Sequence, residues 1–174
     1  MDKIKQILDT SSKKKIDFLL SEIKKKPVLA EEVLSLALIN EHPFSWRAAW
    51  ALSHYSKKNK KFIEDNQDRI ILKLEEIKHP SQVGCLLITL NNIELDSENL
   101  GIVADVCIAM LKGEIEAGYI RMYAMEVMIK IAKQYPELSH EFIEVIEYAK
   151  QGFEKNYIIS RAEKAIDELI KLKV

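Results

Sequence analysis

One phrase of fifteen residues recurs four times along this chain, and this repeat constrains the fold more than any other feature. The copies, separated by shifts of 37, 37 and 40 residues, occupy 42–56, 79–93, 116–130 and 156–170. In the first copy the apolar residues are spaced by four, three and four positions, which places them on one face of a helix. They are Phe44, Ala48, Ala51 and Tyr55. Such a face needs a packing partner.

A second set of amphipathic runs lies between the copies. These runs cover 27–40, 60–77, 95–112 and 136–150, and each carries its own apolar stripe at helical spacing. The four prolines of the chain all fall where a helix is expected to begin, the place that tolerates proline best. They are Pro27, Pro43, Pro80 and Pro136. The repeated unit is therefore predicted to be a pair of helices.

The predicted organisation is a single all-α domain over residues 1–174, with about nine or ten helices. The Lys-rich segment 1–26 is expected to cap one end, because an unprotected end repeat would expose its apolar face. The helix pairs are assigned to 27–56, 60–93, 95–134 and 136–172. A chain of this length buries about two-thirds of its unfolded surface, so its core needs no disulfide or metal.

The amino-terminal segment has no apolar stretch long enough for a signal peptide, and no window approaches the roughly 18 apolar residues of a membrane span. We therefore expect a cytoplasmic protein without membrane association. Cys85 and Cys107 stand alone at apolar helical positions. They are expected to be buried, reduced thiols that act as small hydrophobic residues, with a reactive thiol as the alternative.

Segments 46–52 (WRAAWAL) and 161–166 (RAEKAI) resemble the second helix of HEAT repeats, in which a hydrophobic residue and an arginine precede Ala and Leu. Three copies keep the arginine, as Arg47, Arg121 and Arg161, whereas Gly84 replaces it in the second copy. The resemblance implies a HEAT/ARM-like α–α superhelix, which is a right-handed solenoid.

The order of the motifs narrows this resemblance. The run at 47–52, a Tyr-Ala-Met helix at 123–125 and the Arg-Ala pair at 161–162 together look like a group of short bacterial HEAT-like proteins of unassigned function. Some members of that group carry the label adenylosuccinate lyase. Lyases of that superfamily have a Ser-rich signature loop with Lys and Asn, and this chain has no such loop, so we carry over no catalytic residue.

Residues 140–144 (HEFIE) come within one residue of the HExxH zinc pattern, with Glu144 in place of the second histidine. A single HExxE arises easily in an amphipathic helix. His42 and His79 each precede a proline at an expected helix start and are interpreted as boundary residues. We predict no metal, no cofactor and no catalytic residue.

The strongest candidate surface lies on the second helices. On a helical wheel Trp46, Arg47, Trp50 and His54 fall on a flank away from the apolar face. This flank either packs on the adjacent repeat or lies open in the groove of the solenoid. Packing is favoured for the tryptophans, because each ring buries roughly 150–250 Å². The alternative is a partner anchor, since Trp, Tyr and Arg are frequent hot spots at interfaces.

The repeated arginines present the same choice. Arginines at this position commonly bond the turn or an acidic side chain of the neighbouring unit, and this structural role is the favoured interpretation. If Arg47, Arg121 and Arg161 point into the groove instead, three guanidinium groups would suit carboxylates or phosphates of a partner. Gly84 would then leave a gap in the series.

The net charge of −1 hides an asymmetry, because residues 1–61 carry 13 Lys and Arg against 7 Asp and Glu, and residues 62–174 carry 13 against 20. The clustered lysines are interpreted first as solvated helix ends that favour the carboxyl end of the helix dipole. A patch for an acidic partner or a nucleic-acid backbone is the alternative, and the polarity would also suit head-to-tail association.

Three functions remain open from the sequence. The leading hypothesis is a non-enzymatic module that binds a protein or peptide in its groove through Arg47, Trp50, His54, Arg121 and Arg161. It predicts that changing Arg47 and Trp50 together abolishes binding while the fold is kept. The second is a nucleic-acid-binding protein similar to the alkylpurine DNA glycosylases, which the acidic carboxyl-terminal part disfavours. The third, more remote, is a lyase.

Overall fold

The computed structural model describes residues 1–96, 98–113 and 118–172. Every regular element within these ranges is helical, which confirms the all-α prediction. The α-helices are α1 (Asp2–Ile7), α2 (Lys13–Lys25), α3 (Leu29–Ala37), α4 (Phe44–Tyr55), α5 (Lys60–Glu64), α6 (Gln67–Ile71), α7 (Pro80–Asn91), α8 (Leu100–Lys112), α9 (Gly118–Ala132), α10 (Ser139–Lys150) and α11 (Asn156–Leu172). Two 3₁₀ helices, η1 (Leu74–Glu76) and η2 (Pro136–Leu138), complete the described elements.

The helix starts follow the prolines. Pro80 occupies the first turn of α7, Pro136 begins η2, and Pro43 directly precedes α4. Proline fits these places because its fixed φ is already helical and its missing N–H would have had no partner in the first turn.

The run at 60–77 is not one helix as the amphipathic pattern predicted. It is divided into α5, α6 and η1, and this division explains why the described chain has eleven α-helices rather than nine or ten. The side-chain amide of Asn66 donates to the carbonyl of Phe62 at 2.8 Å, and its backbone N–H bonds to Ile63. Such local side-chain bonds compete with helix continuation. The apolar stripe survives the division, because Ile63, Ile70 and Leu74 are all buried.

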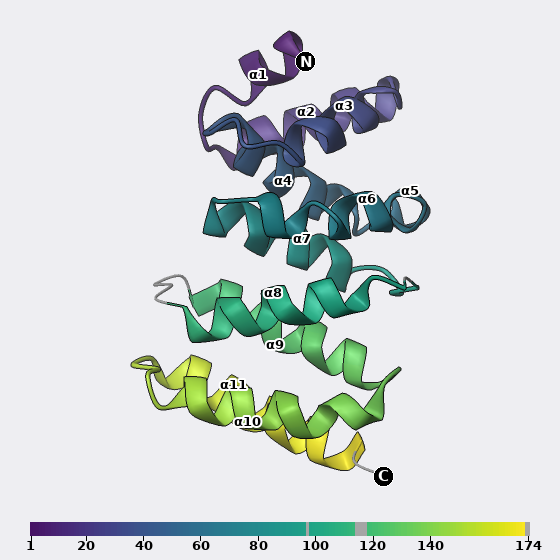
Figure 1. Ribbon diagram of the computed structural model, residues 1–174. Helices are drawn as coiled ribbons and strands as arrows, with labels where there is room; N and C mark the ends of the chain where they lie inside the picture. The colour runs from purple at the N-terminus through teal and green to yellow at the C-terminus, as the bar shows by residue number, and fades with distance from the viewer. Residues whose placement is uncertain (97, 114–117, 173–174) are drawn as a thin grey trace.

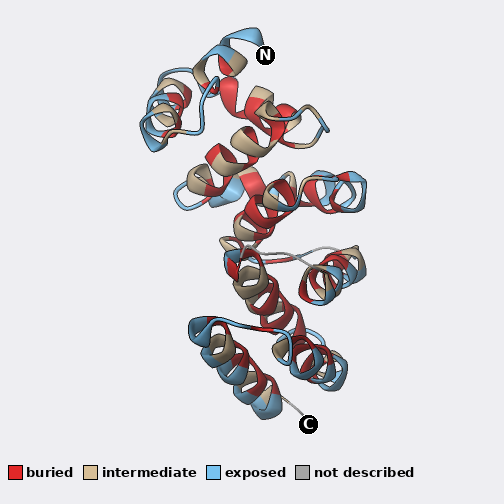
Figure 2. Cartoon of the chain, turned by 90° about the vertical axis from the view of Figure 1, so that its left-hand side faces the viewer, coloured by how far each residue is buried: buried red, intermediate tan, exposed pale blue. Residues whose placement is uncertain are grey.

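The helices stack in two layers (Figure 1). The second helices α4, α7, α9 and α11 pack one on the next, while α8 of the other layer contacts α6, η1 and α10. Helices α3, α8 and α10 each pack against the second helix that follows them, and α2 lies against α4. Figure 2 shows the buried residues running along the column of second helices. One continuous apolar cluster extends from Ile4 in α1 to Leu169 in α11.

Polar side chains join successive units at the ends of helices. The Gln82 amide, in the first turn of α7, donates to the carbonyls of Ala37 at 3.0 Å and Ile39 at 2.8 Å. At the other end of α7, Asn92 donates to the carbonyl of Ser53 at 3.3 Å. The last carbonyls of a helix have no partner within the helix, so these bonds satisfy groups that would otherwise be lost on burial.

Candidate partner-binding face

Five aromatic rings form a line along α4. His42, Trp46, Trp50 and His54 follow one another at intervals of four residues, and His79 from the residue before α7 joins them. The His42 and His79 rings stack with centroids 4.7 Å apart, and His79 stacks on Trp46 at 6.2 Å. The Trp46 and Trp50 rings are 6.1 Å apart, as are those of Trp50 and His54. We call these five residues the ring stripe.

The ring stripe is half-buried rather than sealed. Both tryptophans, His54 and His79 have intermediate exposure, and His42 is exposed. Trp50 packs against the apolar core, whereas the ring contacts of Trp46 are with His79 and Trp50. Part of each tryptophan therefore contributes to packing, and the rest faces solvent.

Burial and positive neighbours act on two of the histidines. Burial lowers the pKa of His54, and the charges of Lys13 and Lys57 lower it further. Burial also lowers the pKa of His79, with a smaller contribution from His42. Both imidazoles are thus held in the neutral form in the folded protein at neutral pH.

Arg47 lies beside the ring stripe and fastens α1. Its Nη1 donates to the main-chain carbonyls of Leu8 at 2.8 Å and Asp9 at 2.6 Å, where α1 ends. Its guanidinium also lies 5.8 Å from the centroid of the Trp46 ring. The N–H donors on Nη1 of Arg47 are therefore bonded to the turn that follows α1.

The other two arginines lie far along the solenoid. Arg121 donates to the carbonyl of Gly113 at 3.2 Å and lies 4.9 Å from the centroid of the Phe153 ring. Arg161 of α11 pairs with Glu126 of α9 at 2.9 Å, so it joins two adjacent units. The three guanidinium groups make three different sets of contacts.

Gly84 is the exception in the arginine series because a neighbouring helix fills its place. A Cβ at Gly84 would lie 2.8 Å from Cγ1 of Ile120 and 3.5 Å from the Tyr119 ring. Helix α9 therefore packs so closely on α7 at this point that a side chain here would force Ile120 to move.

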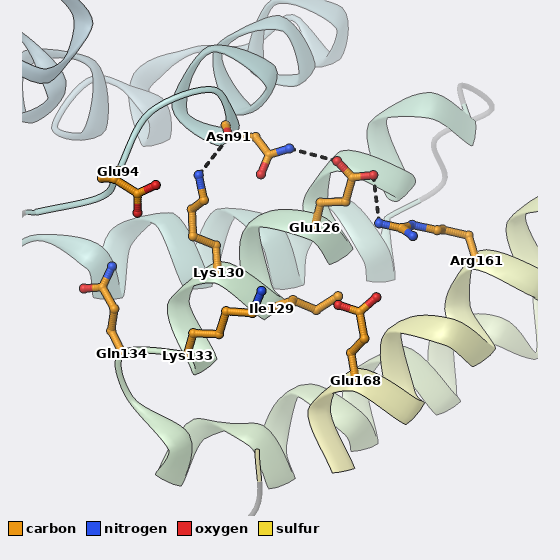
Figure 3. Close-up of a pocket in the computed structure, with 9 residues that line it drawn as sticks. All are labelled: Asn91, Glu94, Glu126, Ile129, Lys130, Lys133, Gln134, Arg161 and Glu168. Atoms are coloured by element: carbon orange, nitrogen blue, oxygen red, sulfur yellow. Dashed lines mark hydrogen bonds and ion pairs between the residues drawn. The ribbon is translucent and has the colours of Figure 1, made fainter. Parts of the chain in front are cut away.

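A charged pocket lies where α7, α9 and α11 meet, and its volume is about 510 Å³. It is lined by Asn91, Glu94, Glu126, Ile129, Lys130, Lys133, Gln134, Arg161 and Glu168. Figure 3 shows a chain of bonds from Asn91 through Glu126 to Arg161, in which Asn91 donates to Glu126 at 2.8 Å. Lys130 donates to the carbonyls of Asn91 at 2.7 Å and Ile93 at 2.5 Å, so it caps α7.

The structure thus divides the residues predicted to form one surface. Arg47, Trp50 and His54 lie together on or beside the ring stripe, Arg161 lines the pocket, and Arg121 belongs to neither. Sequence reasoning missed the two boundary histidines as members of the stripe. The His-Pro pairs at 42–43 and 79–80, related by the repeat of 37 residues, were the signal for this contact.

A model of the HEAT repeat domain matches residues 4–168. The chain belongs to the HEAT repeat family. No curated protein and no solved structure matches it. The stacked pairs of this HEAT-repeat protein agree with the resemblance of segments 46–52 and 161–166 to HEAT second helices.

The residues that suggested zinc or thiol chemistry are an exposed His-Glu pair and two buried cysteines. In the part of the chain that the structure describes, no group of three or more His, Cys, Asp and Glu side chains is arranged to hold a metal ion. Nδ1 of His140 lies 3.5 Å from Oε1 of Glu144, and both side chains are exposed. Cys85 and Cys107 are free and buried, and burial raises the pKa of the Cys85 thiol to about 12. Among the described helices, none is long and apolar enough to cross a membrane.

The two shifted histidines predict a loss of stability on mild acidification. Their pKa values are lower in the folded protein than the roughly 6.5 of an unfolded chain, so folding favours the neutral form. The stabilisation is complete above about pH 6.5 and is lost as the pH falls through the folded pKa. Urea denaturation at pH 7.5 and 5.5 is expected to give a lower free energy of unfolding at pH 5.5. A variant with both His54→Gln and His79→Gln should show a smaller difference in the free energy of unfolding between the two pH values. A difference equal to that of the native chain would contradict the role given to these histidines.

Proposed function

We propose that this HEAT-repeat protein is a non-catalytic scaffold that binds a protein or peptide partner through the ring stripe. One observation carries the proposal, namely that α4 departs from the pattern of its own repeat. The equivalent positions in α7 and α9 are fully or almost fully buried, namely Val83, Leu87, Ile120 and Ala124, and in the end helix α11 they are the exposed polar residues Ser160 and Lys164. Only α4 has large amphipathic rings there, and these rings extend beyond the packing that the repeat requires.

The residue types support the same conclusion. Tryptophan combines a large apolar area with a hydrogen-bond donor, and it is enriched among residues that dominate binding energy. Local departures from a regular packing pattern are expected at functional sites, where packing alone does not decide the residue. The ring stripe is also supported from behind by the core contacts of Trp50, which keep it in place before binding.

The test is affinity capture with the full chain as bait, compared with the Trp46→Ser variant. Trp46 is the better choice than the pair Arg47 and Trp50, since Arg47 holds α1 and Trp50 packs on the core. We expect the native chain to capture at least one protein of which the variant captures about tenfold less, or less still. The reason is that a hot-spot residue contributes roughly 2 kcal/mol or more to binding.

Lys155→Glu is the matched control, because this exposed lysine precedes α11 at the other end of the solenoid. It should capture the same partner as the native chain. Thermal unfolding of each bait establishes that the variants are folded. A set of captured proteins that is the same for the native chain and Trp46→Ser would contradict the proposal, and capture of nucleic acid through the ring stripe would favour the nucleic-acid alternative.

A further inference from the structure

We infer that the ring stripe binds an extended acidic segment of a partner protein, with carboxylates near both ends of the segment and apolar residues between them. This inference rests on the proposed function and adds the chemistry of the partner. It follows from two cations beside the stripe, the free donors between them and the distance between the cations.

The unneutralised charges beside the ring stripe are positive. Arg47 lies over Trp46, and it bonds main-chain carbonyls instead of a carboxylate. Lys57 lies just beyond the carboxyl end of α4, near enough to act on His54. Among the described residues, neither cation has a carboxylate within 4.0 Å.

The carboxylates in the same region are already paired. Asp17, which also acts on His54, forms an ion pair with Lys13. Glu41, next to His42 in the chain, pairs with Lys5 at 2.6 Å. A negatively charged segment would therefore find the charges of Arg47 and Lys57 available, and would meet no unpaired carboxylate from these two positions.

The indole edges add hydrogen-bond donors. Within the described part of the chain, neither Trp46 nor Trp50 donates a hydrogen bond through its indole N–H, and both rings are half-exposed. An indole N–H is a donor only, so it is complemented by carbonyl or carboxylate oxygens. An extended segment presents such acceptors along its main chain.

The distance between the two cations selects the spacing of carboxylates. Lys57 follows Arg47 by ten positions, which corresponds to about 15 Å along a helix axis. An extended chain covers this distance in about four or five residues. The expected motif therefore has two Asp or Glu residues four or five positions apart.

A nucleic acid, the other anionic polymer, fits less well. Base stacking needs a free aromatic face. The Trp46 ring already has the near-parallel rings of His79 and Trp50 beside it, at 10° and 16° and with centroids 6.2 and 6.1 Å away. The stripe offers two free indole N–H groups and two separated cations, which suit carboxylates better than a continuous row of phosphates.

The experiment is a display selection of random peptides without tryptophan on the full chain, with binders to Trp46→Ser removed. Selected peptides are then synthesised and titrated by intrinsic fluorescence. The chain has two tryptophans, both in the stripe, so the signal reports this site alone. A fifteen-residue oligothymidylate is titrated in the same way.

We expect the stripe-dependent peptides to carry carboxylates four or five positions apart. Lys57→Glu should weaken their binding about fivefold to tenfold, and Lys155→Glu should change it less than about twofold. Trp46→Phe, which keeps an aromatic ring but removes the indole N–H and the area of the second fused ring, should weaken binding about threefold or more. Because Lys57 is exposed, its variant tests the charge even if Trp46→Ser proves unstable.

This inference would be overturned by stripe-dependent peptides that are neutral or basic, or by acidic peptides whose binding is unchanged in Lys57→Glu. Either result would leave the proposed function standing. Tighter binding of the oligothymidylate than of any peptide would overturn it in favour of nucleic acid. A selection that yields no peptide able to distinguish the native chain from its stripe variants would contradict the proposed function as well.

Discussion

Replacing Gly84 with arginine is expected to destabilise the protein by about 4 kcal/mol or more, although it restores the residue found in the other three copies of the repeat. Any side chain at this position clashes with Ile120, because its Cβ atom alone would lie 2.8 Å from Cγ1 of Ile120. The neighbouring side chains at this position belong to Ile120 and Tyr119, so they offer the charged side chain no acidic partner. A loss of this size removes much of the roughly 5–15 kcal/mol that stabilises a typical domain.

The same substitution at Gly101 is the matched control. Gly101 lies in α8, and a Cβ there meets no atom within 4 Å. Gly101→Arg is expected to be neutral or to stabilise the helix by up to about 1 kcal/mol, since arginine is a better helix former than glycine. Urea denaturation of both variants measures the difference. A Gly84→Arg variant as stable as Gly101→Arg would show that α9 does not pack closely on α7 at this point.

Replacing Gln82 with leucine is expected to lower the free energy of unfolding by about 2–4 kcal/mol, although leucine is apolar and similar in size. Gln82 is 2% exposed, and its amide is the side-chain donor to the carbonyls of Ala37 and Ile39. Leucine would leave the Ala37 carbonyl buried without a partner. Unsatisfied buried acceptors cost more than the bond itself contributes.

Gln151→Leu supplies the comparison, because Gln151 is exposed at the carboxyl end of α10. A change within about 0.5 kcal/mol is expected there. Chemical denaturation of the two variants separates the loss of the inter-unit bonds from a general effect of adding leucine. A cost below about 1 kcal/mol for Gln82→Leu would mean that these bonds contribute little to the stacking of the units.

The repeat made the fold predictable from the sequence. Its apolar spacing identified the second helices α4, α7, α9 and α11, and the prolines marked several helix starts. The division of 60–77 was not predictable from apolar spacing, because the stripe continues through it. The local hydrogen bonds of Asn66 decide that division, and they leave no periodic signal.

The site was predictable only in part. The register placed Trp50 and His54 on one flank, but it did not give the direction in which each arginine side chain points. Arg47 ends at the turn after α1 and Arg161 ends at Glu126, since these are the nearest acceptors that stacking brings within reach. The contact of His42 with His79 depends on how two units stack, and a single sequence shows that only through the shared His-Pro pairs.

The most direct test of the central claim is ¹⁹F NMR of the chain labelled with 5-fluorotryptophan, recorded with and without a captured partner. The two tryptophans give two resonances, which Trp46→Phe assigns, and an unlabelled partner adds no signal. Binding through the ring stripe predicts that both resonances shift or broaden as partner is added, to an extent that saturates. A partner that binds with the affinity seen in the capture experiment while both resonances stay unchanged would contradict the claim.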